Sequence, residues 1–347
     1  MIRGFSIISP ASSYLIDYPN RVERGCKFLN KCGYNVNFEK NASKKMLYYS
    51  GTADERVEDI NNALENENTD IIMASIGGYN SNQLLDKLDY EKISESNKIF
   101  CGYSDITCLL LAIYVKTKKI VFHGPTFLPE ICEYPQPYEY TWNCLNELLN
   151  NSCIDYKVPN YEIKEFIDWK QEEINLVVKQ KDYNNCAWKV NKRGKTKAEI
   201  IGGNLSSILT ILGTEYLPIE VFDNKILFLE DVNISIGEFD SLMQALRLRG
   251  IFKNIKGLII GKFVEDDNNV VGVVYFYIIK KSTAKVVSIC LKDNSYIKQV
   301  FELLVNLKGI KEFHISPTSP AICSLLEKMP GVEKTFKFYY KAKKIPR

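Results

Sequence analysis

A serine at the point where a strand-like segment changes into a helix-like one is the first residue with a possible chemical role. In "KIFCGYSDITCLLLAIY" (98–114), Ser104 follows an apolar run and precedes apolar residues at helical spacing. A tight strand-to-helix turn lifts its side chain clear of the sheet and aims the helix's first N–H groups at the reaction centre. Ser104 can therefore be a nucleophile, but it can equally be an ordinary N-cap, and the local sequence leaves both interpretations open.

A glycine-containing loop, "SIGGYNSN" (75–82), ends the preceding predicted strand. Its glycine backbone N–H groups, together with the N–H of Asp105, can form an oxyanion hole beside Ser104. One such donor is commonly worth about 10²–10³ in rate. Glycine pairs are also common turn formers, so this motif alone does not establish catalysis.

An isolated carboxylate stands in the apolar run "ILFLEDV" (226–232). By the period of two, Glu230 shares a face with Ile226 and Phe228, so it is expected to be buried. A buried carboxylate needs a cationic or hydrogen-bonding neighbour, and either an oriented histidine or a structural arginine would serve. Asp231 points to the other face and is expected to be solvated.

The sequence contains two histidines, His123 and His314. His123, in "FHGP", is expected to pack or to support a neighbouring site residue. A lone histidine such as His314, in "EFHISPTSP", is most often a polar surface residue or a satisfied core residue. With so few histidines and no Cys-x-x-Cys among ten scattered cysteines, neither a metal site nor a disulfide framework is expected. Dinucleotide and P-loop signatures are missing too, so no cofactor is predicted.

The charge balance argues against several partner classes. The 45 basic and 42 acidic residues leave a net charge of +3, which favours neither a nucleic acid polymer nor a membrane surface. The apolar stretch in "MIRGFSIISPAS" is too short for a signal peptide, and no run approaches the length of a membrane helix. A cytoplasmic protein is therefore expected.

The elements that would position these residues are apolar strand-like runs that alternate with segments of helical spacing. Predicted strands alternate with helices, two of which are expected at 19–33 and 53–66, and Asn80 with Gln83 resembles a capping box. The predicted strands cover 2–9, 34–39, 70–76, 98–103 and 119–124. This pattern predicts an α/β fold with a flavodoxin-like, doubly wound parallel sheet. Ligands bind at the carboxyl ends of such strands, where Ser104 and the glycine loop fall.

A second domain follows a less regular segment. We expect residues 1–150 to form the N-terminal domain, 151–197 a connection with a long loop, and 198–347 a smaller α/β domain. In the last of these, apolar residues at helical spacing predict a helix around 205–212. A strand at 225–232, a helix at 239–250 and a strand at 257–263 are expected to follow.

Six motifs in order resemble one known family. The segments "SIGGYNSN", "GYSDIT", "HGP", "IIGGNLSSI", "ILFLED" and "GLIIGKF" are similar in order and approximate spacing to the LD-carboxypeptidase family of serine peptidases. The long, tryptophan-containing middle of the chain resembles that of the family branch related to the microcin C self-immunity carboxypeptidases. The resemblance covers roughly residues 1–264.

The resemblance implies a Ser–Glu–His triad spread over two domains. Its motif positions place the nucleophile at Ser104, the orienting acid at Glu230 and the general base at His314, with oxyanion N–H donors at Gly78 and Asp105. The base lies in a context that departs from the family's Gly-His-x-x-Pro, because Phe313 replaces the glycine. A catalytically impaired, ligand-binding or regulatory homologue is therefore the alternative.

The resemblance also implies a small substrate. This is either a peptidyl-nucleotide antibiotic of the microcin C type or a murein tetrapeptide cleaved at an LD-peptide bond, and the enzyme is expected to be a homodimer. Substrate contacts are assigned to Gly77 and Asn204, and nucleobase stacking to Trp169 or Trp188. An amidotransferase-like enzyme using Cys101 is a remote third interpretation, since that thiol falls within the strand.

Overall fold

The computed structural model describes most of the chain up to Val264 and several strands beyond it. The described residues are 3–151, 159–163, 168–170, 176–183, 194–264, 272–280, 283–291, 312–315, 332–336 and 339–343. The chain divides into two compact units that alternate along the sequence. The first comprises Met1–Ala187, Thr196–Asp231 and Leu242–Gly261, and the second comprises Trp188–Lys195, Val232–Ser241 and Lys262–Arg347.

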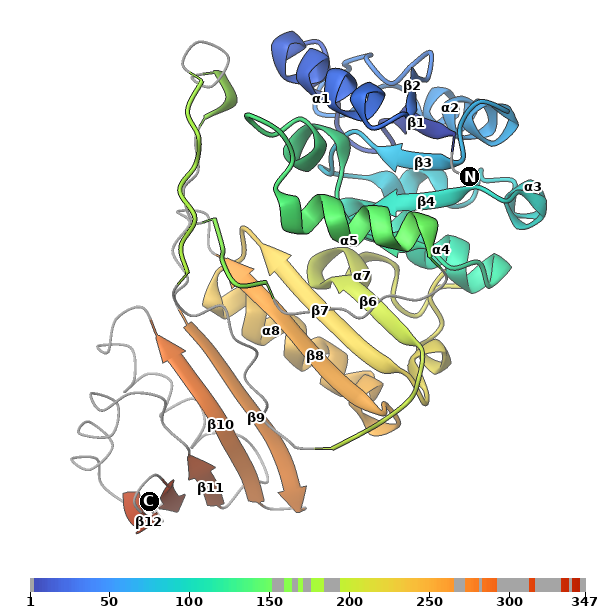
Figure 1. Ribbon diagram of the computed structural model, residues 1–347. Helices are drawn as coiled ribbons and strands as arrows, with labels where there is room; N and C mark the ends of the chain where they lie inside the picture. Colours follow the sequence, from blue (N-terminus) through green and yellow to red (C-terminus); the bar gives the residue numbers. More distant parts are fainter. Residues whose placement is uncertain are drawn as a thin grey trace. The chain divides into compact units, whose positions relative to one another are not determined.

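A five-stranded parallel sheet with the order β2-β1-β3-β4-β5 forms the centre of the first unit. Its strands are β1 (Gly4–Ile8), β2 (Asn35–Phe38), β3 (Ile71–Ala74), β4 (Ile99–Gly102) and β5 (Phe122–His123). This is the flavodoxin-like order, and Figure 1 shows β1, β3 and β4 running side by side. The predicted α/β fold is confirmed.

Helices connect these strands, and their ends follow from local sequence. They are α1 (Pro19–Lys31), α2 (Ala53–Glu65), α3 (Tyr90–Glu95), α4 (Thr107–Thr117) and α5 (Glu139–Asn150). Pro19 occupies the first turn of α1, and Thr52 and Glu55 form a capping box for α2. The capping box predicted at Asn80 is wrong. Asn80 is left-handed (φ 68°), makes no side-chain cap and precedes only the 3₁₀ turn Ser81–Leu84.

The core of this unit is apolar on both faces of the sheet. Ile7 and Ile71 are buried on one face and Ile8 and Ile72 on the other, which explains why the strands are continuous apolar runs rather than alternating ones. The π-helix Phe127–Ile131 follows β5 and also packs into this cluster. The carboxyl ends of β3, β4 and β5 are thereby fixed on a rigid layer.

A three-stranded sheet with the order β6-β7-β8 follows, in which β6 and β7 are parallel. It comprises β6 (Ile200–Asn204), β7 (Ile226–Val232) and β8 (Gly257–Val264), with helices α7 (Leu205–Ile211) and α8 (Ile236–Leu248) between them. These are the strands and helices predicted at 205–212, 225–232, 239–250 and 257–263, with α8 starting three residues earlier than expected. Figure 1 shows β6, β7 and β8 in that order.

A separate sheet with the order β12-β13-β11-β10-β9 lies in the second unit. Its strands are β9 (Gly272–Lys280), β10 (Thr283–Leu291), β11 (Glu312–Ile315), β12 (Val332–Phe336) and β13 (Tyr339–Lys343). All neighbours pair antiparallel except β10 with β11.

In the described parts of the chain, no helix has the length and apolar character needed to cross a membrane.

Candidate active site

Ser104 lies on a sharp turn between β4 and α4. Its φ is +60°, a left-handed conformation that costs a non-glycine residue roughly 1–2 kcal/mol. The preceding Tyr103 is extended, and a 3₁₀ turn (Ser104–Ile106) leads into α4. Neither this turn nor α4 has a side-chain cap, so Ser104 is not the N-cap that the sequence left open. A strained, half-buried turn residue of this kind is typical of nucleophiles.

The glycine loop packs directly against this serine. A Cβ at Gly77 would lie 2.9 Å from the Ser104 Cβ and 3.1 Å from its Oγ. Gly78 has a φ of +128°, and a Cβ there would lie 2.1 Å from the Oγ of Ser12. Ser12 also donates its backbone N–H to the Gly77 carbonyl oxygen at 3.2 Å. Only glycine fits at both positions, which brings the loop's backbone within reach of the reaction centre.

A buried arginine that sequence reasoning missed holds the far end of this loop. Arg56, 2% exposed, donates to the carbonyl oxygens of Pro10 at 2.8 Å and Asn80 at 3.2 Å, and to Gln83 Oε1 at 2.7 Å. Burial lowers the pKa of its guanidinium. One side chain therefore ties together the ends of β1, the glycine loop and the following 3₁₀ turn. A basic residue in the middle of a polar helix gives no sequence signal for this role.

The start of the nucleophile's helix is tied to the same loop. The backbone N–H of Ser81 donates to Asp105 Oδ2 at 2.8 Å, and the Ser81 hydroxyl donates to the Asp105 carbonyl oxygen at 2.7 Å. The pKa of the Asp105 carboxyl is raised, because its burial outweighs the opposing effect of hydrogen bonds from Ser81. The two segments predicted to supply oxyanion donors, near Gly78 and at Asp105, are thus held as one assembly.

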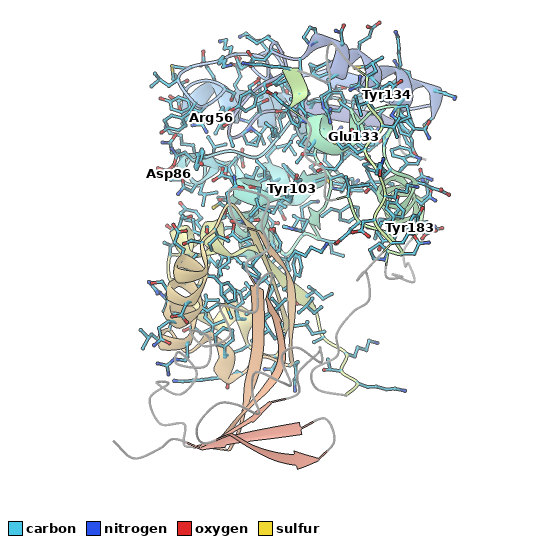
Figure 2. The ribbon with its side chains drawn as sticks, turned by 90° about the vertical axis from the view of Figure 1, so that its left-hand side faces the viewer. Arg56, Asp86, Tyr103, Glu133, Tyr134 and Tyr183 are labelled. Carbon is cyan, nitrogen blue, oxygen red and sulfur yellow. The ribbon has the colours of Figure 1, made fainter. Side chains whose placement is uncertain are left out.

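Behind the turn, Tyr103 takes part in a buried hydrogen-bond network. Its hydroxyl donates to Glu130 Oε1 at 2.9 Å, and Glu130 Oε2 accepts from the backbone N–H of Thr126 at 2.8 Å and from its hydroxyl at 3.1 Å. Burial raises the pKa of both Tyr103 and Glu130. Figure 2 shows Tyr103 in the middle of the first unit's side chains. The network fixes the residue that precedes the nucleophile.

Glu230 lies on β7, opposite Asn204 in the register with β6. Its side chain is 17% exposed, and its Oε1 lies 3.6 Å from the Nε2 of His123. Burial, followed by the charge of Asp231, raises the pKa of Glu230 to about 7. Burial lowers the pKa of His123 to about 4, although 26% of that side chain remains exposed. Among the described residues, the histidine that faces Glu230 is His123, and the expectation that Glu230 orients the catalytic base stays a prediction.

The expectation that Asp231 is solvated is wrong. Asp231 is 3% exposed and accepts hydrogen bonds from Asn204 Nδ2 at 2.7 Å, from the Ser206 N–H at 2.8 Å and from the Ser206 hydroxyl at 2.6 Å. Asp231 shares its face of β7 with the buried Leu227 and Leu229, and the first turn of α7 supplies N–H groups that attract a carboxylate there. The face that carries Asp231 is therefore the buried one, and the face that carries Glu230 is half-buried.

Strand β6 approaches the nucleophile's helix through two left-handed glycines, Gly202 (φ +148°) and Gly203 (φ +139°). The N–H of Asn204 donates to Thr107 Oγ1 at 3.2 Å, and the Asn204 side chain caps α7 by accepting from the Ser207 N–H at 3.0 Å. The Ser207 hydroxyl donates to the Ser104 carbonyl oxygen at 3.3 Å. The segment carrying Asn204 is thereby connected to the nucleophile's turn, and its role as a substrate contact stays a prediction.

Other predicted site residues lie apart from this assembly or outside the described residues. Trp169 packs edge-on against Tyr18, with ring centroids 5.2 Å apart, and lies under the guanidinium of Arg21 at 4.5 Å. Trp188 is outside the described residues. The backbone of His314 belongs to β11, but its side chain is outside the described set. The roles of these three residues stay predictions.

The described cysteines do not form a reactive or metal-binding group. Cys101 is 1% exposed, and burial raises the pKa of its thiol. Within the described ranges, no group of three or more His, Cys, Asp or Glu side chains could hold a metal ion.

Comparison with known proteins identifies the family. The model of the LD-carboxypeptidase N-terminal domain matches residues 6–124, and that of the C-terminal domain matches residues 197–292. The chain belongs to the LD-carboxypeptidase family. It is therefore a serine-type carboxypeptidase, as the resemblance implied.

Several relatives extend over most of the chain. The microcin C7 self-immunity protein MccF of Escherichia coli is 36% identical over 261 residues, covering 74% of each chain. A probable murein peptide carboxypeptidase of Bacillus subtilis is 25% identical over 258 residues, covering 74% of this chain and 71% of its own. A solved structure of MccF in complex with glutamyl sulfamoyl guanosine matches with a TM-score of 0.70 at 34% identity, covering 76% of this chain and 78% of that one.

Proposed function

We propose that this carboxypeptidase uses a Ser104–Glu230–His314 triad to hydrolyse a small peptidyl substrate. The observation that carries the proposal is the left-handed Ser104 packed against Gly77 at the carboxyl end of β4. A serine kept in that conformation, with glycine backbone beside its Oγ, has the arrangement that acyl transfer requires.

The chemistry follows from these roles. The Ser104 Oγ attacks the scissile carbonyl carbon while the base takes the hydroxyl proton, and the N–H groups near Gly78 and at Asp105 stabilise the resulting oxyanion. The base then gives the proton to the leaving group, and water hydrolyses the acyl-enzyme with the same residues. We assign the base to His314 and its orientation to the Glu230 carboxylate.

A peptidyl-nucleotide of the microcin C type is our first substrate candidate. The relative of that name shares 36% identity over three quarters of the chain, and a structure of MccF contains an aminoacyl-nucleotide analogue. An LD-peptide bond in murein tetrapeptides is the second candidate, because a murein peptide carboxypeptidase covers a similar share of the chain at lower identity. We also expect a cytoplasmic homodimer, for which size-exclusion chromatography with light scattering is the test of subunit number.

The test is direct cleavage. The purified full chain is incubated with processed microcin C analogues and with murein tetrapeptide, and products are identified by mass spectrometry beside a Ser104→Ala control. We expect cleavage of one substrate class, its loss in Ser104→Ala, and a fall of several orders of magnitude in kcat in His314→Ala. Binding of either substrate without cleavage by the unmodified chain would instead establish the catalytically impaired alternative.

A further inference from the structure

A second histidine, outside the proposed triad, faces the proposed acid. His123 ends β5, the edge strand that pairs with β4 through Gly102. Its Nε2 lies 3.6 Å from Glu230 Oε1, slightly beyond hydrogen-bonding distance. Catalytic hydrogen bonds are often long in unliganded enzymes and shorten when substrate binds.

The imidazole of His123 is held in place by its surroundings. A Cβ at Gly203 would lie 3.0 Å from the His123 Nδ1, so only a glycine there leaves room for the ring. The ring meets Phe228 edge-on, with centroids 5.2 Å apart, and lies 6.3 Å from the ring of Tyr103. These contacts direct Nε2, rather than Nδ1, at the Glu230 carboxyl group.

The Glu230 carboxyl group needs a donor. In the described residues, Oε1 is buried and has no hydrogen-bond partner. Asn204 Nδ2 donates to Asp231 and, through a side-chain hydrogen bond, also lowers the Glu230 pKa, but Oε1 itself has no partner. The Tyr103 hydroxyl is engaged with Glu130. Asp231 is a further carboxylate and raises the pKa of Glu230. Gly261, which faces Glu230 from β8, adds no polar side chain.

We propose that His123 is a positioning residue for Glu230. As a neutral imidazole, it donates its Nε2–H to Oε1 and holds the carboxylate so that Oε2 is left for the catalytic base. This assignment rests on the proposed role of Glu230 in the triad, and it adds a residue that acts through Glu230 without touching substrate.

The electrostatics agree with this arrangement. Burial keeps the His123 pKa near 4, so the ring is neutral at neutral pH and carries one N–H. Burial raises the Glu230 pKa to about 7, so a donated hydrogen bond favours the ionised form that the triad requires. Removing the donor therefore raises the Glu230 pKa relative to its hydrogen-bonded state.

The first test compares two substitutions at His123. His123→Leu keeps much of the volume and removes the donor, whereas His123→Gln keeps an N–H donor near the Nε2 position. We expect the acid limb of the kcat/KM profile to move up by about one pH unit in His123→Leu, which is about a tenfold loss on the acid side. His123→Gln restores the wild-type limb. Equal losses in both variants without a shifted limb, or no loss in either, would overturn the proposal.

The second test does not depend on activity. Because the sequence contains only two histidines, ¹⁵N labelling of histidine gives two imidazole spectra, which His314→Ala assigns. We expect His123 to remain the neutral Nε2–H tautomer down to about pH 5, with its Nε2 shift changed in Glu230→Leu. A Nδ1–H tautomer would overturn the proposal even in an active enzyme. An inactive chain with the expected tautomer would contradict the proposed function alone.

Discussion

Replacing Gly77 with alanine tests the contact between the glycine loop and the nucleophile. The added methyl group would lie 2.9 Å from the Ser104 Cβ, whereas ordinary contacts begin near 3.4 Å. Either the loop or the serine must therefore move by about half an ångström. Relieving such overpacking costs about 1–3 kcal/mol of folding free energy.

The catalytic cost is larger than the structural one. The shift displaces the nucleophile and the backbone donors together, and displacements of this kind cost about 10² in rate. We expect kcat/KM to fall about 100-fold, mostly in kcat, while the variant still unfolds cooperatively. Steady-state kinetics on the cleaved substrate and thermal unfolding measure the two effects separately.

Gly237→Ala is the matched control, because a Cβ at this exposed helical position meets nothing within 4 Å. It should keep wild-type kinetics and stability. Wild-type activity in Gly77→Ala would refute the placement of the loop against Ser104. An equal loss in both variants would show that the effect is not specific to the site.

Three further changes test the surrounding structure. Arg56→Lys keeps the charge but cannot make the three bonds to Pro10, Asn80 and Gln83, so we expect kcat to fall about tenfold at unchanged KM, as measured by steady-state kinetics. Asp231→Asn weakens charge-assisted bonds and should cost about 2–3 kcal/mol in urea unfolding. Glu230→Gln removes a group whose folded-state pKa of about 7 exceeds its unfolded value, so that wild-type stability declines between about pH 4.5 and pH 7. The free energy of unfolding of Glu230→Gln relative to the wild type should therefore rise by up to about 2 kcal/mol from pH 5 to pH 8, as measured by urea unfolding. A pH-independent difference would contradict the raised pKa.

The sequence predicted the parallel sheet because continuous apolar strands are recognisable from local sequence. It also predicted that the candidate site lies at the carboxyl ends of the strands, because glycine turns mark those ends. It singled out Glu230 because an acid within an apolar strand departs from the pattern, but that side chain is half-buried rather than buried. Ser104 remained ambiguous because a cap and a nucleophile require the same residue at the same corner. The left-handed φ that separates them is a property of the fold.

Other features depend on contacts between distant segments. Asp231 was misassigned because the partner that buries it, the first turn of α7, lies more than twenty residues earlier. Arg56 looks like one more charge on a polar helix, and its three acceptors belong to two segments, one after β1 and one at the end of the glycine loop. The contact between His123 and Glu230 joins β5 to β7, and the sequence indicated only that His123 packs or supports a neighbouring site residue, without naming its partner.

The central claim is that Ser104 is the nucleophile. Labelling with a fluorophosphonate, followed by peptide mapping, tests it most directly because the reagent bonds covalently to an activated serine. The account predicts one adduct per chain on the peptide containing Ser104, and no adduct in Ser104→Ala. Labelling of another residue, or substrate hydrolysis that survives in Ser104→Ala, would contradict it.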